Sequence, residues 1–280
     1  MGIIDLWQDE VFSAVNSLVK NAKLSFVSNN CIIDAQNGIL VHLIPLINKF
    51  NPEDLIALQN KYQNENKQII HLWEDIWLNK KNQVLIRFKS LFSQNIGFHA
   101  RKTKIVDLTI NDSKVFLESN HLQGYVKAKY AFGLADKSEI IAVATFSDAR
   151  PMKLKGNDYL SAELVRFASK DGVTVVGGLS KLIKHFSKQI QVNDIMSYAD
   201  KDWSLGKGYE KLNFLQTAET EPLYFYVNAE NLHRYTPHRL PKDILLSFKA
   251  QNNLNLDEYL KELNYIKVFN TGNLKYHLYL

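Results

Sequence analysis

One stretch of the chain, residues 162–214, most constrains how it can fold. A buried-type strand over 164–167 is followed by a short loop, and Gly177-Gly178 then open a helix with apolar residues at helical spacing. A second strand is predicted over 194–198. A strand that runs into glycines at a helix start presents free backbone N–H groups and the positive end of a helix dipole. Because glycine keeps side chains out of the way, this arrangement suits phosphate or pyrophosphate.

The phrase Tyr209-x-Lys-Leu-x-Phe214 follows the second strand. Strand, glycine turn, helix, strand and then this phrase resemble, in that order, the core of the GNAT acyltransferase fold. The resemblance implies that acetyl-CoA or another acyl-CoA is the cofactor, with its pyrophosphate at the glycine turn. It also implies that Tyr209 protonates the leaving thiolate. The residues that would then hold the cofactor are Val176, Gly177, Gly178, Ser180 and Lys181.

A second resemblance concerns DNA. The segments 121–124, 164–169, 175–181 and 197–204 are similar to the C-terminal region of phage homing-endonuclease-like proteins. That region is in turn similar to the Mom family of DNA-base modifiers, which are GNAT-like. The phage proteins carry a Vsr-like nuclease domain in front, and residues 53–92 resemble its last strand and helix. The resemblance implies DNA as a partner.

A nuclease of this kind needs several carboxylates at its sheet to hold a divalent metal, which activates a water molecule. In the strands where the family places them, 31–34 and 39–43, only Asp34 is acidic. We therefore expect this unit to have lost its metal site, and we predict no metal. We interpret Glu74 and Asp75 as a solvated pair that partly caps a helix start.

The composition sets only broad limits. With 280 residues, one or two domains are expected, and a net charge of +5 permits a polyanionic partner without requiring one. The single cysteine, Cys31, excludes an internal disulfide and a multi-cysteine metal site. Neither a signal peptide nor an apolar stretch of about 18 residues is found, so we expect a cytoplasmic protein without a membrane partner. The sequence does not indicate an oligomeric state.

The expected fold class is α/β (α+β), a GNAT-like mixed sheet with flanking helices behind a small, degenerate restriction-endonuclease-like α/β domain. We predict a degenerate Vsr-like nuclease-type domain over 1–92, a basic linker over 93–106, and a GNAT-like domain with a C-terminal extension over 107–280. The linker contains Arg101, Lys102 and Lys104 beside aromatic residues. This segment either lies along a phosphate backbone or forms a solvated edge strand.

Three residues are candidates for catalysis. Tyr209 is either the acid or a half-buried tyrosine that packs a helix on the sheet. Asp200 is either a general base or the cap of a turn or helix. His121 is a second candidate base, although a lone histidine is more often structural.

The DNA hypothesis adds further candidates. Gln123 could pair with an adenine edge, and Trp203 either stacks on an unpaired base or packs in the core. Arg166 interrupts an apolar strand, so it should face a cleft or an acidic partner. Glu163, three residues earlier, should lie on the opposite strand face. The nucleic-acid-binding candidates are Arg101, Lys102, Lys104, Gln123, Arg150, Arg166, Trp203 and Ser204.

These observations support three hypotheses. The first is a GNAT-like transferase that acts on DNA, either by base modification or by acyl transfer from a coenzyme A thioester to an amine. The second is a non-enzymatic DNA-binding module of phage or mobile-element origin. The third is a divalent-metal-dependent DNA endonuclease, which the missing carboxylates disfavour.

Overall fold

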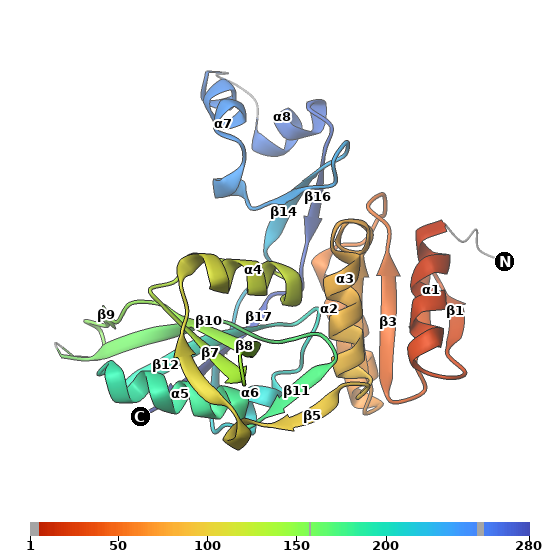
Figure 1. Ribbon diagram of the computed structural model, residues 1–280. Coiled ribbons are helices and arrows are strands. Elements are labelled where there is room, and N and C mark those ends of the chain that lie inside the picture. Colours follow the sequence, from red (N-terminus) through yellow and green to blue (C-terminus); the bar gives the residue numbers. More distant parts are fainter. Residues whose placement is uncertain (1–5, 157, 251–254) are drawn as a thin grey trace. The chain divides into compact units, whose positions relative to one another are not determined.

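A computed structural model describes residues 6–156, 158–250 and 255–280, and its backbone contacts divide the chain into two compact units (Figure 1). The first unit comprises Met1–Lys81, Asp200–Ser204 and Thr220–Asn273; the second comprises Asn82–Ala199, Leu205–Glu219 and Leu274–Leu280. The domain limits expected from the sequence stay a prediction, because compactness does not establish independent folding.

A four-stranded sheet with the order β1-β2-β3-β4 forms the centre of the first unit. Its strands are β1 (Lys23–Val27), β2 (Asn30–Asp34), β3 (Ile39–Ile44) and β4 (Gln68–Trp73). The β1–β2 and β2–β3 pairs are antiparallel, whereas β3 and β4 are parallel. A parallel pair needs a crossover connection, and helix α2 (Pro52–Asn64) supplies it. The capping residue is Asn51, whose side chain accepts from the Asp54 amide in a capping box.

Two helices and a second small sheet complete the first unit. Helix α1 (Leu6–Leu18) precedes the sheet, and α3 (Glu74–Leu91) follows it. Helix α3 has a kink at Lys80, and only its part up to Lys81 belongs to the first unit. The small sheet has the order β15-β14-β16. Its strands are β14 (Tyr224–Asn228), β15 (Arg234–Tyr235) and β16 (Tyr265–Phe269). Between β15 and β16 the chain forms the helices η2 (Pro237–Arg239), α7 (Lys242–Lys249) and α8 (Leu256–Glu262).

The expectation that Glu74 and Asp75 form a solvated pair is wrong for Asp75, which is 1% exposed. Arg234 donates to both of its carboxylate oxygens, from Nε at 2.8 Å and from a terminal nitrogen at 2.6 Å. Glu74 accepts from the backbone amide of Leu46 at 2.8 Å. A buried carboxylate needs a paired charge, and here the partner comes from a distant part of the sequence.

An eight-stranded mixed sheet forms the second unit, with the order β13-β17-β12-β10-β8-β7-β6 and β9 paired to β10. In chain order the strands are β6 (Lys104–Asp107), β7 (Tyr130–Asp136), β8 (Glu139–Phe146), β9 (Arg150–Pro151), β10 (Leu160–Ser169), β12 (Asp194–Asp200), β13 (Leu215–Glu219) and β17 (Asn273–Tyr279). Strands β10 and β12 are parallel, and β10 and β8 antiparallel. The predicted mixed sheet with flanking helices is therefore confirmed.

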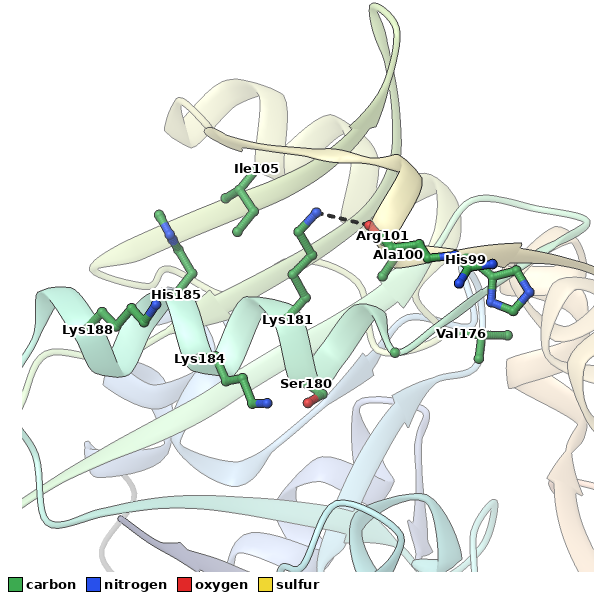
Figure 2. A pocket seen from close by; sticks show the side chains of 11 residues that line it. His99, Ala100, Arg101, Ile105, Val176, Ser180, Lys181, Lys184, His185 and Lys188 are labelled. Carbon is green, nitrogen blue, oxygen red and sulfur yellow. Dashed lines mark hydrogen bonds between the residues drawn. The ribbon is translucent and has the colours of Figure 1, made fainter.

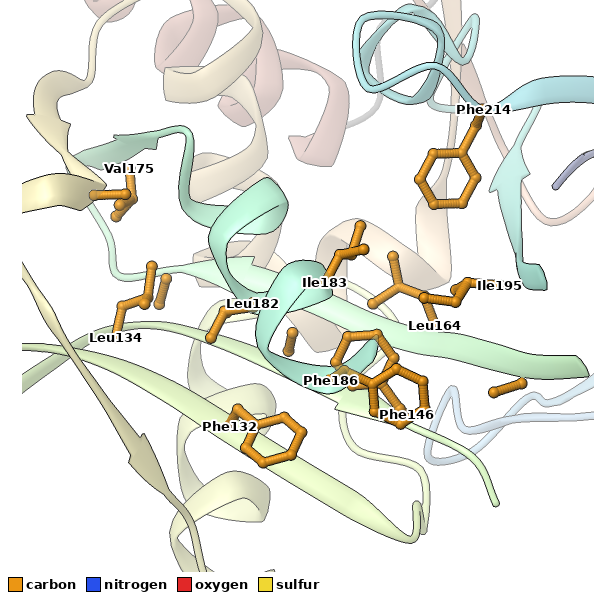
Figure 3. Packing of buried hydrophobic residues seen from close by; sticks show 14 of the residues in the cluster. Phe132, Leu134, Phe146, Leu164, Val175, Leu182, Ile183, Phe186, Ile195 and Phe214 are labelled. Carbon is orange, nitrogen blue, oxygen red and sulfur yellow. The ribbon is translucent and has the colours of Figure 1, made fainter. Parts of the chain in front are cut away.

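Helices cover both faces of this sheet. Helix α5 (Gly178–Gln189) packs Leu182, Ile183 and Phe186 on the face that carries Phe132 and Phe146 (Figure 3). Helix α4 (Ile110–Asn120) instead packs against the cluster that contains Val143 and Ala168. Because side chains alternate along a strand, Val143 and its neighbours Ala142 and Ala144 point to opposite faces. The short helix α6 (Lys207–Glu210) completes the unit.

The loop expected between the central strand and Gly177 contains an additional strand, β11 (Val173–Val176). It pairs in parallel with β5 (Ile96–His99), from the segment expected to be a linker, and η1 (Ala100–Lys102) follows β5. Strand β6 lies at the edge of the large sheet, in agreement with the edge-strand alternative for Lys104. None of the helices in the described part of the chain combines the length and apolar character that a membrane span requires.

Two fully buried histidines lie opposite each other in the β3–β4 register. Nδ1 of His42 is 3.1 Å from Nδ1 of His71, and Nε2 of His71 is 3.3 Å from the carbonyl of Leu55. That carbonyl can only accept, so His71 donates from Nε2 and accepts at Nδ1 from His42. Burial lowers the pKa of His71 to about 4 and holds that of His42 well below its usual value, with the neighbouring His71 lowering it further.

This histidine pair predicts a loss of stability in acid. Because the folded-state pKa values lie below those of the unfolded chain, the unfolded chain binds more protons below about pH 6.5, and stability falls as the pH approaches 4. For His71 the loss amounts to about 3 kcal/mol. Urea unfolding at several pH values measures it. The His42→Leu/His71→Leu double variant should lose this part of the pH dependence, whereas the exposed-site control His238→Gln should keep it. An unchanged pH dependence in the double variant would contradict the assignment.

Candidate functional site

The pairing between the parallel strands β10 and β12 is short. It spans three positions, from Ser161–Asp194 to Glu163–Met196, and in the described residues no pair follows it. At the same point the register between β10 and β8 shifts between Leu164 and Arg166, so that Val165 forms a bulge. A bulge bends its strand. The carboxyl-terminal parts of β10 and β12 therefore run on without backbone pairing to each other.

A chain of two hydrogen bonds lies where this pairing ends. Ser197 Oγ donates to the carbonyl oxygen of Leu164 at 2.9 Å, and the hydroxyl of Tyr209 lies 2.9 Å from the same Oγ. A serine hydroxyl has one hydrogen, and Leu164 uses it. The hydrogen between the two hydroxyls therefore belongs to Tyr209, which donates to Ser197.

The Tyr209 ring is packed while its hydroxyl reaches the strands. It stacks on Tyr276 with 5.2 Å between ring centroids and meets the edge of Phe214 at 5.3 Å. Burial raises the pKa of Tyr209, and the Glu163 carboxylate adds to this, whereas the Ser197 hydrogen bond and the charges of Arg87 and Arg166 lower it. The net shift is upward, so the phenol keeps its proton at neutral pH.

Gly206, at the start of α6, is required by the packing of this tyrosine pair. Its φ of +74° lies in the left-handed region. A Cβ at this position would lie 1.9 Å from the Tyr276 hydroxyl oxygen. That hydroxyl in turn lies 3.3 Å from Glu210 Oε1, one residue after Tyr209. Gly206 therefore allows α6 to lie close against Tyr276, which fixes the position of Tyr209.

A pocket of about 530 Å³ lies beside the first turns of α5 (Figure 2). Most of its polar lining is basic. The lining residues are His99, Ala100, Arg101, Ile105, Val176, Gly177, Ser180, Lys181, Lys184, His185 and Lys188. The ammonium group of Lys181 already donates to the carbonyls of Ala100 at 3.0 Å and Thr103 at 2.5 Å. A ligand that binds this group would have to replace those hydrogen bonds.

The two glycines at this corner have different roles. Gly177 is exposed, adopts φ +75° and caps α5 without a side chain, so its place in the chain requires glycine and leaves the first-turn amides uncovered by a capping group. Gly178 is buried, and a Cβ there would come within 3.0 Å of Val175 and 3.2 Å of Leu134. Gly178 is therefore explained by helix–strand packing.

The pocket brings together residues predicted for two different ligands. Val176, Gly177, Ser180 and Lys181 were predicted to hold a cofactor, and Arg101 to hold DNA. Lys102 and Lys104 follow Arg101 and are exposed. Arg150 is exposed. It lies on β9, where it pairs with Ser161 of β10.

His121, Gln123 and Arg166, which were also predicted as site residues, instead make contacts in the loop that follows α4. The ring nitrogen Nδ1 of His121, the last-turn cap of α4, accepts from the Gln123 amide at 3.1 Å. Arg166 donates from Nε to the Gly124 carbonyl at 3.1 Å and from a terminal nitrogen to the Val165 carbonyl at 2.8 Å. Arg166 thus ties this loop to the bulge. The bulge also breaks the alternation that was used to separate Glu163 from Arg166, so that argument fails.

Asp200, Trp203 and Ser204 belong to the first unit. Asp200 accepts at Oδ1 from the Asp202 amide at 3.0 Å, and its carbonyl accepts from the amides of Trp203 and Ser204. Trp203 is 7% exposed. In the described ranges no group of three or more His, Cys, Asp and Glu side chains is placed to hold a metal ion.

Sequence reasoning missed several residues of this site. Lys184 and Lys188 follow Lys181 at helical spacing, three and then four residues further on, and could have been placed on one helix face with it. Gly206 precedes the tyrosine phrase and could have been proposed as a helix start. Ser197 lies in the segment 197–204 that carries the second resemblance, but nothing in the sequence indicated that its hydroxyl would meet that of Tyr209.

Comparison with known proteins gives remote structural similarities. No protein-family model and no curated protein sequence matches the chain. A Bacillus subtilis acetyltransferase in complex with CoA has 14% identity and a TM-score of 0.37, covering 64% of this chain and 99% of that one. A GNAT family acetyltransferase from Elizabethkingia anophelis with acetyl-CoA bound has 12% identity, a TM-score of 0.36 and the same coverage. The IAA acetyltransferase from Bacillus cereus has 10% identity, a TM-score of 0.36 and again that coverage. TM-scores this low do not establish a shared family.

The packing at Gly206 can be tested with a matched pair of substitutions. Gly206→Ala should destabilise the protein by about 1–3 kcal/mol, because it adds a methyl group against Tyr276 and places alanine at positive φ. Gly208→Ala, two residues later in α6, has nothing within 4 Å of the new Cβ and should leave stability nearly unchanged. Urea unfolding followed by circular dichroism compares the two. Equal stability of both variants would contradict the role assigned to Gly206.

Proposed function

We propose that this protein binds an acyl-CoA and transfers the acyl group to an amine, with a DNA base as the acceptor. One observation carries the proposal. The hydroxyl of Tyr209, which keeps its proton at neutral pH, is held where the pairing between β10 and β12 ends. A proton donor buried beside unpaired strand edges is suited to an extended ligand that ends in a reacting group.

The residues present fit the two parts of coenzyme A. Its phosphates match the basic pocket at the uncapped start of α5, where Gly177 and Ser180 lie beside Arg101 and Lys184. Its pantetheine chain contains amides, which can pair with the backbone edge of a strand as an added peptide strand does. Residues 164–169 of β10 pair with β8 on one side, and their other edge, which has no backbone pairing with β12, provides such an edge.

When bound, acyl-CoA supplies an activated thioester whose sulfur departs and gains from a proton. Tyr209 holds that proton at its hydroxyl. A second group must take a proton from the attacking amine. Asp200 and His121 stay candidates from the sequence, and we add Glu163, which is the last β10 residue paired with β12 and precedes Leu164, and whose charge helps to raise the pKa of Tyr209.

DNA as the acceptor is supported by charge and by the sequence resemblance. The exposed Lys102 and Lys104 continue the basic segment beyond Arg101, outside the lining of the pocket that is given to the coenzyme phosphates. Phosphate contacts of this kind position a duplex without reading its sequence. The Mom-like and phage-related assignment, the nuclease-like first domain and the cytoplasmic location stay predictions.

Acetyl-CoA binding can be tested by placing a negative charge in the pocket. Ser180→Glu should weaken binding at least tenfold, because the new carboxylate competes for the helix start and repels phosphate, while it favours the helix itself. Isothermal titration calorimetry with acetyl-CoA measures the affinity.

The control is Ser187→Glu, which makes the same charge change on the same helix outside the pocket lining. It should bind acetyl-CoA like the unchanged protein. If the unchanged, folded protein shows no binding at millimolar acetyl-CoA, the proposed function is overturned. Equal weakening by both variants would overturn the placement of the phosphates.

The alternative is a DNA-binding module without transferase activity, and the shared pocket favours it as a second candidate. Lys184→Glu/Lys188→Glu should then weaken binding of a fluorescent duplex and lower the salt slope of that binding by about 2. Lys114→Glu/Lys137→Glu, with the same charge change at exposed positions away from the pocket, is the control. Duplex binding with the expected salt slope but no acetyl-CoA binding would select this alternative. If the two double variants weaken binding equally, the pocket is not the DNA site.

A further inference from the structure

The hydrogen bonds around Ser197 show where its own hydroxyl hydrogen and that of Tyr209 lie. Ser197 is 2% exposed and lies on β12 one position beyond Met196, the last residue paired with β10. Its hydroxyl spans to the Leu164 carbonyl, which is the next position on β10. It therefore takes the place of a backbone hydrogen bond at the end of the ladder, and it is also the acceptor for Tyr209.

We infer that Ser197 is a positioning residue that acts through Tyr209, by holding the phenol proton in the resting site and stabilising the phenolate once that proton has left. This inference rests on the proposed transferase function for its catalytic consequence. The link between the two hydroxyls does not rest on it.

The step is a single proton transfer. The O–H bond of Tyr209 breaks, its proton goes to the departing sulfur, and an S–H bond forms, which leaves a negative charge on the phenolate oxygen. Rotation of the Ser197 hydroxyl about its Cβ–Oγ bond turns its hydrogen from the Leu164 carbonyl to that oxygen. The oxygen atoms do not need to move, because they already lie 2.9 Å apart. A charge-assisted hydrogen bond of this kind is stronger than the neutral one that it replaces.

The groups around the Tyr209 hydroxyl support a role for Ser197 in stabilising the phenolate, beyond a purely structural one. Burial raises the pKa of Tyr209, so a phenolate here has lost most of its water. The charges of two arginines, Arg87 and Arg166, also favour the phenolate, and Arg166 donates to the carbonyls of Gly124 and Val165. Ser197 is the hydroxyl in direct hydrogen-bond contact with the phenol oxygen.

The test measures the pKa of the phenol at position 209. A 3,5-difluorotyrosine placed at position 209 of the full chain titrates at lower pH than tyrosine and gives a fluorine NMR signal of its own. Ser197→Ala should raise the pKa of this phenol by about one unit or more, because the phenolate loses a hydrogen bond. Ser197→Thr keeps the hydroxyl and should restore the original value. Circular dichroism confirms that each variant is folded.

A kinetic measurement then separates the inference from the proposed function. With acetyl-CoA and DNA as substrates, Ser197→Ala should lower kcat about tenfold with little change in KM for acetyl-CoA, and Ser197→Thr should recover most of the rate. If the phenol pKa is the same in Ser197→Ala and in the unchanged protein, the inference is overturned whatever the activity. If the pKa shifts but acetyl-CoA neither binds nor reacts, the hydroxyl link stands and the transferase function fails.

Discussion

The bulge at Val165 is the feature on which the candidate site depends. A regular β10 would continue its parallel pairing with β12, and the backbone edge at Leu164 would be closed by the next strand. Because the register slips at Val165, pairing ends at Glu163, and Ser197 meets the Leu164 carbonyl with a side chain instead of an amide. The hydroxyl of Tyr209 meets Ser197 at this point, just beyond the last backbone pair between β10 and β12.

The second element of the site, the start of α5, is supported by a different set of contacts. Lys181 holds the segment that follows β5 through two carbonyls, and Gly178 allows the helix to pack closely on Val175. These contacts position the pocket without filling it, so Gly177 and Ser180 stay at its lining. The second unit thus carries both a basic pocket and a protonated phenol, the combination on which the proposed acyl transfer from a coenzyme A thioester rests.

Local signals in the sequence predicted much of the fold but little of the site geometry. An asparagine followed by a proline is a local signal for a helix start, and α2 begins at such a pair, Asn51-Pro52, because helix capping depends on adjacent residues. The Tyr209 hydroxyl partner, the acceptors of Lys181 and the burial of Asp75 by Arg234 all depend on residues far apart in the chain. The bulge at Val165 changes the side-chain alternation by one residue, and no turn residue marks it in the sequence. For the same reason β11 was expected to be a loop, since its partner β5 lies far away in the chain.

The central claim is that one ligand occupies both the start of α5 and the unpaired edge of β10. Backbone amide chemical shifts of the labelled protein, followed during a titration with acetyl-CoA, test it most directly. The account predicts large changes in two separate segments, residues 177–180 and residues 164–169, with saturation at the same concentration. Changes confined to the helix start would identify a simple phosphate site, and changes in neither segment would contradict the account.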